Sequence, residues 1–579
     1  MEKKKVNNKR KRDEISNTVK VEEEEKKSYE IKDEELKQTK VKKLKKSKES
    51  PELVQGGEVG DETNNKMQRI ILWFRNDLRL HDNAILNYAV SQKTKNKEII
   101  PVYSFDQRFL NRKVKKYDTL KCGLVRTRFI LESAQNFRDR LEKIGSKLLV
   151  TMDKPEDFLP QLIDKDVDNT IVYQDEICSE ELAVEKAVKE SCEGQKIVNL
   201  WGSTVYHVDD LGFHPKELPH IYGKFREKTA DVKIRPLFAQ PKSGQLPYAK
   251  EPSPLMEEAS KFMPTLKDFG FTKEQIEKPK DKRACYDFVG GEDNAVKRLN
   301  EYIMGTKSVG SYAITRNNLI GANYSSKFSP WLACGALSPK YIYYQVKEFE
   351  KTHKSNESTK VFLDELFWRD FYRFWAIKYG NQMFSSYGIY NREYYNWQED
   401  RENVRRWKEG STGMPIIDAF MRECNETGFM PNRGRMIVAC YLTMDLKHDW
   451  REGAYHFEEK LIDHDVQSNY GGWNFSAGIG PGRVLVFNSI KQSKDHDKHG
   501  EYIKMWVPEL KNVPIEYIHE PWTMPKDLQK GSKCIIGQDY PHPIDCPKYT
   551  NKNQHVKDKA AKKIQIDSEK KLKQTTLKK

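Results

Sequence analysis

Residues 463–473 read Asp-His-Asp-Val-Gln-Ser-Asn-Tyr-Gly-Gly-Trp, which is the most specific local pattern in this chain of 579 residues. Two carboxylates, an amide and an indole stand close together in this stretch. Similar side chains continue outward through the segment 362–475, and they are Glu365, Trp368, Arg369, Asn432 and Arg435. So many indoles beside charged and amide groups are unusual for a solvent-facing surface. The segment therefore indicates a functional site.

The region around this segment has helical periodicity, from Gly290 to about Trp522. Apolar residues recur at helical spacing in four stretches, which are 360–375, 416–426, 435–446 and 453–462. The pairs Ser329-Pro330 and Ser338-Pro339 are typical of a serine N-cap followed by a proline in the first helical turn. We therefore expect an all-helical C-terminal domain.

The region from Arg69 to Trp201 alternates between two patterns. Short apolar runs predict buried strands at 70–74, 99–103, 147–150, 170–173 and 197–200. Amphipathic stretches such as 125–144 and 180–191 lie between them. This alternation predicts an α/β domain with a doubly wound parallel sheet. The first strand leads into Arg75-Asn76-Asp77 and not into a glycine-rich turn, which argues against a nicotinamide-dinucleotide site and an oxidoreductase of that type.

Chain length and composition predict several domains with charged tails. A chain of this length is too long for one core. Residues 1–66 hold 19 Lys and Arg against 16 Asp and Glu, which predicts disorder. The predicted organisation is a charged tail at 1–66, an α/β domain at 67–205, a connector rich in Pro, Lys and Gly at 206–285, a helical domain at 286–525 and a basic tail at 526–579.

The tails supply most of the formal net charge of +15, because the residues from Lys548 onward hold 11 Lys against 3 acids. Lysine-rich tails bind phosphate backbones without sequence preference, and they also serve as solubilising segments, so both alternatives stay open. The basic cluster at 8–12 matches a nuclear import signal, although such short clusters also arise by chance.

The nine cysteines show no paired metal-ligand spacing, so we expect reduced thiols, no metal site and an intracellular protein. No run of 18 apolar residues exists, and the N-terminus lacks an apolar signal core. We expect no membrane association and a location in the nucleus, the cytoplasm or both, with an organelle not excluded.

Three groups of residues carry chemistry, and each has a plainer alternative. The loop 325–329 before Pro330 suits a diphosphate through free backbone N–H groups, but a serine-rich helix cap explains it as well. The side chains at 362, 365, 368, 369 and 372 share part of a helix face, which also fits a salt bridge with a packed indole. Trp397, Trp450 and Trp473 could pass electrons, or they could simply fill the core.

Taken together, the motifs resemble those of the photolyase/cryptochrome family, and they are most similar to those of its DASH branch. The resemblance covers about 69–522 and is carried by motifs at 121–129, 206–211, 323–333, 367–371, 432–435 and 463–473. It implies a protein that uses light, with FAD bound in the helical domain.

The resemblance also implies roles for individual residues. For the ribityl and diphosphate part of FAD they are Tyr312, Ser325, Ser326, Lys327, Phe328 and Ser329. For the isoalloxazine and ribose they are Arg369, Arg435, Asp463 and Asp465, with Asn469 near flavin N5 and Phe362 as a further cofactor contact. The lesion pocket would take Glu365, Trp368, Asn432 and Met436. The photoreduction relay would be Trp473, Trp450 and Trp397, with Trp473 nearest the flavin.

The implied activity is light-driven repair of cyclobutane pyrimidine dimers, mainly in single-stranded DNA, by one electron from reduced FAD. Glu176 resembles the acid that holds a folate antenna, 5,10-methenyltetrahydrofolate, although a deazaflavin or no antenna stays open. The alternative function is a blue-light photoreceptor that binds DNA, RNA or a protein and repairs little. We expect a monomer.

Three positions depart from the family pattern. Phe475 stands where duplex-repairing relatives have a second tryptophan, and this smaller ring fits a preference for single strands. Met436 replaces the glutamine usual in this branch and is typical of ordinary pyrimidine-dimer photolyases. The segment 480–487 is shorter and more apolar than the family loop, so contacts expected there do not transfer.

Overall fold

The computed structural model describes residues 67–94, 96–391, 396–480, 484 and 486–544. The predicted N-terminal tail, the C-terminal residues from 545 and residues 481–483 and 485 of the 480–487 segment lie outside the described residues. The described residues all belong to one compact unit, Asn65–Lys579.

The N-terminal part contains a five-stranded sheet in the order β5-β2-β1-β6-β7, and every neighbouring pair is parallel. The strands are β1 (Gln68–Phe74), β2 (Lys97–Ser104), β5 (Leu149–Thr151), β6 (Asp168–Gln174) and β7 (Lys196–Leu200). The central strand places Ile71 opposite Ile100 of β2 and Ile171 of β6. A central strand is covered on both faces, which explains its continuous apolar run. All five predicted strands are confirmed.

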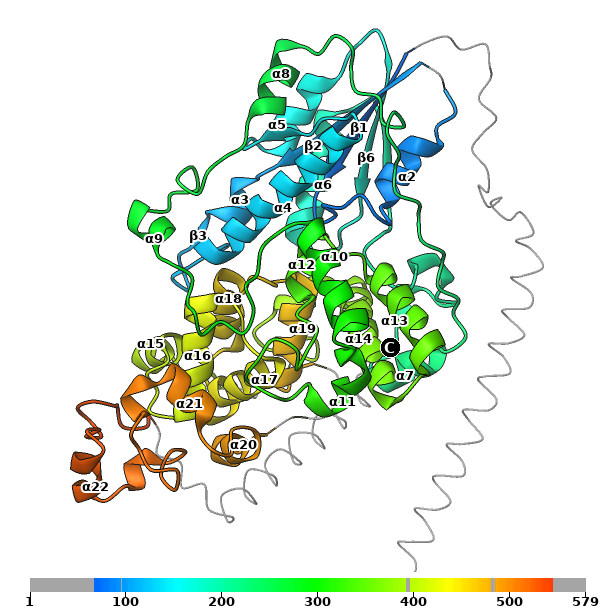
Figure 1. Cartoon of the computed structure of the whole chain (residues 1–579). Helices are drawn as coiled ribbons and strands as arrows, with labels where there is room; N and C mark the ends of the chain where they lie inside the picture. Colours follow the sequence, from blue (N-terminus) through cyan, green and yellow to red (C-terminus); the bar gives the residue numbers. More distant parts are fainter. Residues whose placement is uncertain (1–66, 95, 392–395, 481–483, 485, 545–579) are drawn as a thin grey trace, which may run out of the picture. The chain divides into compact units, whose positions relative to one another are not determined.

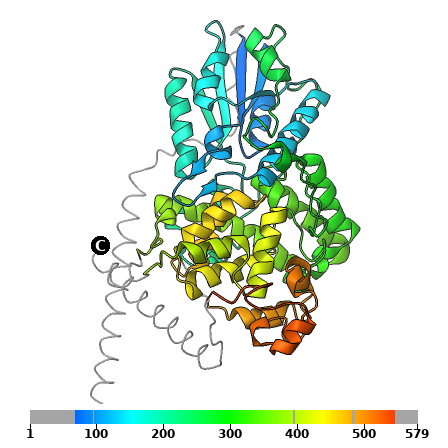
Figure 2. The same cartoon turned by 90° about the vertical axis from the view of Figure 1, so that its left-hand side faces the viewer.

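The two faces of the sheet bury alternate side chains of β1. Ile70, Leu72 and Phe74 join one apolar cluster, whereas Ile71 and Trp73 join another. Helices on both sides of the sheet complete these clusters (Figures 1 and 2). On the first face these are α2 (Ala84–Ser91) and α4 (Leu124–Lys143), and on the second α5 (Pro155–Phe158) and α6 (Ser179–Ser191). The doubly wound α/β prediction is confirmed.

The connector contains more structure than its composition suggests. Its helices are α7 (Tyr222–Lys228), α8 (Pro254–Lys261) and α9 (Lys273–Glu277). Met256 and Ala259 of α8 are buried in the same cluster as Ile71. Part of the connector therefore packs on the sheet and is not a simple linker.

The C-terminal part is helical, as predicted (Figure 1), but it extends beyond the predicted boundary at 525, because the helix Lys526–Gly531 and the buried Cys534 and Tyr540 lie within the predicted basic tail. Its helices are α10 (Glu292–Asn300), α11 (Tyr312–Thr315), α12 (Ser329–Ala333), α13 (Pro339–His353), α14 (Glu357–Tyr379), α15 (Arg401–Glu409), α16 (Pro415–Thr427), α17 (Asn432–Cys440), α18 (Trp450–Lys460), α19 (Val466–Ser476), α20 (Ser489–His496), α21 (Glu501–Trp506) and α22 (Lys526–Gly531). One large apolar cluster runs through this part.

One local prediction was wrong. Ser329 is not the helix cap, because Phe328 holds that position, and the Ser329 hydroxyl donates to Asp463 Oδ2 at 2.6 Å. The helix predicted for 435–446 is confirmed: α17 runs to Cys440 and continues as a single π-turn, Tyr441–Asp445. Ser338 does cap α13, as predicted.

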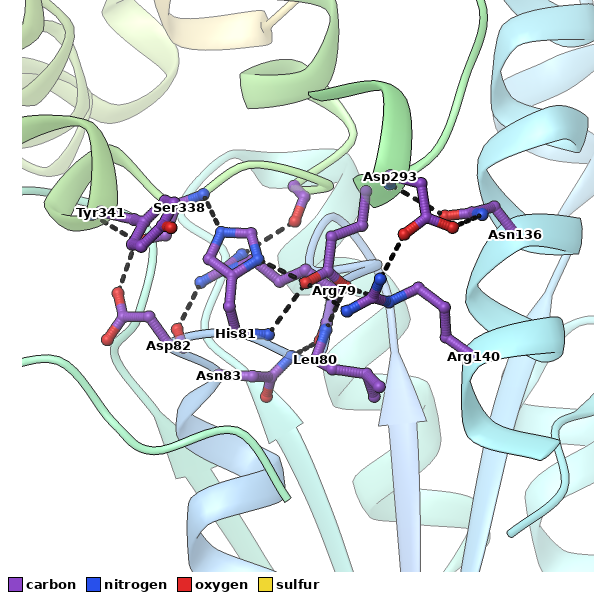
Figure 3. A network of polar contacts seen from close by, with 12 residues as sticks. Arg79, Leu80, His81, Asp82, Asn83, Asn136, Arg140, Asp293, Ser338 and Tyr341 are labelled. Atoms are coloured by element: carbon purple, nitrogen blue, oxygen red, sulfur yellow. Dashed lines mark hydrogen bonds and ion pairs between the residues drawn. The ribbon is translucent and has the colours of Figure 1, made fainter. Parts of the chain in front are cut away.

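A polar network joins the α/β part to the helical part (Figure 3). His81 Nδ1 lies 2.6 Å from Glu292 Oε1, and His81 Nε2 accepts the backbone N–H of Ser338 at 3.1 Å. Because Nε2 accepts, the ring proton belongs on Nδ1. Asp82 pairs with Lys340 at 2.8 Å. The loop after β1 is thus held by the N-termini of α10 and α13.

Backbone also meets backbone at this junction. Gly335 has φ +72°, and a Cβ atom there would lie 1.8 Å from the carbonyl oxygen of Asn76. Arg79 donates to the Gly335 carbonyl at 3.0 Å. Only glycine permits both this conformation and this approach.

We therefore predict that Gly335→Ala lowers the thermal unfolding midpoint by several degrees, because a left-handed conformation alone costs about 1–2 kcal/mol and the overlap adds to it. Gly223→Ala is the matched control, since a Cβ there meets nothing within 4 Å. Differential scanning fluorimetry measures both. Equal midpoints for Gly335→Ala and the wild type would contradict the close contact.

Candidate functional site

Helix α14 carries the predicted cluster, with Arg369 directed to other partners than Glu365 and Trp368. Its N-terminus is fixed by a capping box at Asn356, and it runs for 23 residues. Phe362 is buried in the core, while Glu365 and Trp368 are half-buried. Arg369 follows one residue later and points to a different set of partners. One helix thus brings an acid, an indole and a guanidinium together, as the spacing predicted.

Glu365 is paired with a residue that sequence reasoning missed. Its carboxylate accepts a hydrogen bond from Arg316, at the end of α11, and both side chains are about one-third exposed. Burial raises the pKa of Glu365, and Arg316 opposes that shift. The acid is therefore easier to protonate than an ordinary glutamate. Arg316 gave no sequence signal, because it is a lone arginine in an irregular segment.

A second arginine lies near Arg316. Arg433 of α17 donates to Asn317 Oδ1 at 3.0 Å. Burial lowers the pKa of Arg433, and the neighbouring Arg316 lowers it further. Two guanidiniums close together suit an anion such as a phosphate. Asn432, which is exposed, and Met436, which is half-buried, lie on the same helix.

Trp368 is surrounded by other rings. Tyr222 of α7 stacks on it with a centroid distance of 3.8 Å and an angle of 10°. Phe475 approaches its edge at 6.4 Å. Phe475 therefore lies beside the indole predicted to meet a substrate, whereas Tyr222 comes from the connector and was not predicted.

Arg369 belongs to a buried chain of charges. Its guanidinium lies 3.7 Å from Asp465 Oδ2, and Arg373 approaches the same oxygen at 3.5 Å. Arg373 also donates to Glu176 Oε2 at 2.8 Å. Burial alone would raise the pKa of Asp465, but Arg369 and Arg373 bring it below its usual value. Sequence reasoning missed Arg373, which is the centre of this chain.

Asp463 and Arg435, both predicted to contact the cofactor, form an ion pair with each other. Arg435 Nη2 donates to Asp463 Oδ2 at 2.8 Å, the oxygen that also accepts from Ser329. The other oxygen, Oδ1, is buried and has no partner among the described residues. An unpartnered buried acceptor is costly, so this atom fits an N–H or O–H donor of a bound cofactor. A Cβ on Gly472 would meet nothing within 4 Å, which leaves space beside α19.

The predicted loop at 325–329 is built around a buried lysine. Lys327 has φ +63°, and its ammonium donates to Ser325 Oγ at 3.1 Å. Burial lowers the pKa of Lys327 to about 7. A nearby phosphate would favour the charged form of Lys327, and the diphosphate contact stays a prediction. Ser326 is half-buried beside it.

Aromatic contacts connect this loop to α14. Phe328 and Tyr312 both present their rings edge-on to Phe362, at 6.1 and 5.2 Å. Asn469 of α19 donates its amide to the Ala454 carbonyl at 3.0 Å, which fixes the orientation of the amide. The structure thus joins the predicted cofactor residues through three sets of direct contacts, around Phe362, Asp463 and Asp465.

The three predicted relay tryptophans are linked through shared neighbours. The indole N–H groups of Trp397 and Trp450 both donate to the carbonyl of Ser386, each at 3.2 Å. Trp450 contacts Tyr470 at 5.9 Å, one helical turn from Trp473 on α19. Trp397 is half-buried, whereas Trp450 and Trp473 are buried. Their role as an electron relay stays a prediction.

A cavity of about 470 Å³ lies where sheet and helices meet. Glu176 is in its wall, together with Arg373, Asp465 and Gln467. Both carboxylate oxygens of Glu176 have partners, because Asn76 donates to Oε1 at 3.0 Å and Arg373 donates to Oε2. The predicted antenna acid is thus in a cavity wall and is held rigidly.

Within the described part of the chain, no cluster of His, Cys, Asp or Glu has the arrangement of a metal site. Over the same residues, no helix has the length and apolar character needed to span a membrane.

Comparisons with known proteins agree with this site. Residues 362–559 match the family model "FAD binding domain of DNA photolyase", and residues 70–242 match the model "DNA photolyase". The helical part is therefore an FAD-binding domain of the photolyase type.

Individual relatives extend the agreement to most of the chain. A cryptochrome DASH of Danio rerio is 42% identical over 85% of this chain and 92% of the relative. The crystal structure of a Synechocystis cryptochrome has TM-score 0.78 and 41% identity, covering 86% of this chain and 99% of that one. A Sulfolobus tokodaii photolyase structure, described as holding two FAD molecules with one implicated as a light-harvesting cofactor, has TM-score 0.66 and 26% identity, covering 86% of this chain and 100% of that one. With this fold, this site and these relatives, the chain belongs to the cryptochrome DASH branch of the photolyase/cryptochrome family.

Proposed function

We propose that this protein is a light-driven lyase that splits cyclobutane pyrimidine dimers, mainly in single-stranded DNA, with reduced FAD as its cofactor. The observation that carries the proposal is the arrangement on α14. Glu365 and Trp368 are half-buried and accessible, whereas Arg369, one residue on, is directed to the buried Asp465. A single helix turn therefore offers substrate contacts on one side and cofactor contacts on the other.

Reduced FAD, when bound and excited by light, would supply one electron that opens the cyclobutane ring and would take it back once both carbon–carbon bonds between the pyrimidines have broken. The protein's own residues would hold it in place. Arg435 and Asp463 provide a donor and a free acceptor for the ring and ribose, and Arg369 and Asp465 provide the corresponding pair nearby. The Ser325–Ser329 loop with Lys327 would take the diphosphate.

Glu365 and Trp368 act on the lesion. A protonated Glu365 can donate to a pyrimidine carbonyl, and its raised pKa makes that form more available. Trp368 offers an aromatic face for a base. Arg316 and Arg433 provide cations for the phosphates beside the dimer, with Asn432 and Met436 nearby on α17.

The preference for single strands rests on the cost of extracting the dimer. A paired dimer must leave the base stack, which costs a few kcal/mol and less in a single strand. Phe475 beside Trp368 provides a smaller ring than the tryptophan of duplex-repairing relatives. It therefore offsets less of that cost.

The cavity at Glu176 supports a second, light-harvesting cofactor. A carboxylate held by Asn76 and Arg373 suits the N–H donors of a pterin, so we propose 5,10-methenyltetrahydrofolate. A second flavin is the other candidate, since the Sulfolobus relative is described as holding two.

The second candidate function is a blue-light photoreceptor that binds DNA, RNA or a protein. The Arg316–Glu365 ion pair favours it, because the carboxylate is already occupied without a substrate. Under either function, the expected protein is a monomer located inside the cell.

Repair is tested by illuminating the anaerobically reduced protein with a thymine dimer in a single-stranded oligonucleotide and in a matched duplex. Recovery of thymine absorbance is expected mainly in the single strand. Glu365→Ala should reduce the rate by about 100-fold, the lower end for one positioned acid–base group, while FAD stays bound. No recovery from either substrate, with FAD bound and photoreducible, would favour the photoreceptor.

The antenna assignment is tested with Glu176→Gln, which keeps the size of the side chain but removes its charge. This variant should lose folate after reconstitution and retain FAD, as read from the absorbance of each cofactor. If folate binds equally well to both proteins, Glu176 is not its anchor.

The relay is tested with Trp473→Phe. Photoreduction of oxidised FAD should slow at least about tenfold, because phenylalanine is much harder to oxidise than indole and each tenfold corresponds to about 1.4 kcal/mol of barrier. Trp506→Phe is the control, since that buried indole packs under Arg283 outside the path. Unchanged photoreduction in Trp473→Phe would mean that electrons enter elsewhere.

A further inference from the structure

We propose that Tyr222 is a positioning residue for Trp368: it covers one face of the indole, so that a pyrimidine can stack only on the opposite face. This inference rests on the proposed lesion-binding function. It assigns a role in the site to the connector helix α7, which lies far from α14 in the sequence.

The two rings form a fixed pair. They are nearly parallel at 10° with centroids 3.8 Å apart, which leaves no room for a base between them. The Tyr222 hydroxyl donates to the backbone carbonyl of Asp364 at 2.9 Å and to its carboxylate at 3.2 Å. Burial raises the pKa of Tyr222 far above its usual value, so the hydroxyl remains a donor.

Helix α7 is itself anchored to α14. Arg226 pairs with Asp364 at 3.0 Å, lies 4.0 Å above the ring of Phe367 and donates to the hydroxyl of Tyr206 at 2.7 Å. Phe225 is fully buried. Tyr222 and Arg226 both contact Asp364, which lies one helical turn before Trp368 on α14. The tyrosine ring is therefore anchored to the same helix that carries the indole.

The opposite face of Trp368 has no comparable partner. Phe371, Tyr372 and Phe475 are its other described ring neighbours, at interplanar angles of 89°, 36° and 65°. None of these described contacts is parallel to the indole. The half-buried Trp368 therefore keeps one face of its indole for stacking, and Tyr222 determines which face that is.

The consequence for binding is preorganisation. A base stacks with the most favourable binding free energy when the indole already has its bound orientation. Otherwise part of that free energy is lost in immobilising the side chain on binding. Removing the Tyr222 ring should therefore weaken binding of a dimer by roughly three- to tenfold. Binding of undamaged DNA through phosphate contacts should not change.

The test measures fluorescence anisotropy of single-stranded oligonucleotides, with and without one thymine dimer, on the FAD-loaded protein in the dark. The variants are Tyr222→Ala, Tyr222→Leu, which keeps apolar volume without a ring plane, and Tyr222→Phe, which keeps the ring. The preference for the dimer over the undamaged strand should fall three- to tenfold in the first two. Tyr222→Phe should remain within about twofold of the wild type.

FAD content and photoreduction should stay unchanged in all three variants. A preference unchanged in Tyr222→Leu, or an equal loss of binding for both oligonucleotides, would overturn the proposal. If the wild type prefers the dimer but does not split it in light, the lyase proposal fails. The ratio of the affinities for the dimer and the undamaged strand, compared between variants, then still decides the role of Tyr222. A wild type that does not distinguish the two strands overturns both.

Discussion

The buried ion chain Glu176–Arg373–Asp465–Arg369 is the constraint on which the rest of this structure depends. Burying one unpaired charge costs several kcal/mol, so the chain is tolerable only because its charges alternate. It begins after strand β6 at Glu176, passes through Arg373 of α14 to Asp465, the residue that precedes α19, and returns to α14 at Arg369. Removing either central member, Arg373 or Asp465, would leave a buried charge without its ion-pair partner.

Asp465 shows how this chain sets up the cofactor site. It caps α19 by accepting the backbone N–H of Ser468 at 2.8 Å, and it also pairs with both arginines of α14. The helix that carries Asn469 and Trp473 therefore starts at a member of the ion chain. Glu176 at the other end is in the wall of the 470 Å³ cavity, so the proposed antenna and flavin sites share one set of charges.

The sequence predicted secondary structure correctly where the burial of a residue follows the local spacing of apolar side chains. The five strands could be predicted because a sheet covered on both faces needs continuous apolar runs, and α14 because its apolar and polar positions repeat at helical spacing. Arg373 could not be predicted, because its partner Glu176 is 197 residues away and no local pattern connects them. Tyr222 was missed because a connector rich in Pro, Lys and Gly gives no periodic signal. Ser329 was misassigned because its hydroxyl donates to Asp463, a partner too distant in sequence for a local pattern to indicate.

The most direct test of the account is a crystal structure of the FAD-loaded protein with a single-stranded oligonucleotide that contains one thymine dimer, grown in the dark. The account predicts the dimer flipped against α14, with the Glu365 carboxyl at hydrogen-bond distance, about 2.6–3.2 Å, from a pyrimidine carbonyl. It also predicts that Arg316 has left Glu365 for a phosphate. A dimer bound elsewhere, with the Arg316–Glu365 pair intact, would contradict the assignment of this surface as the lesion site.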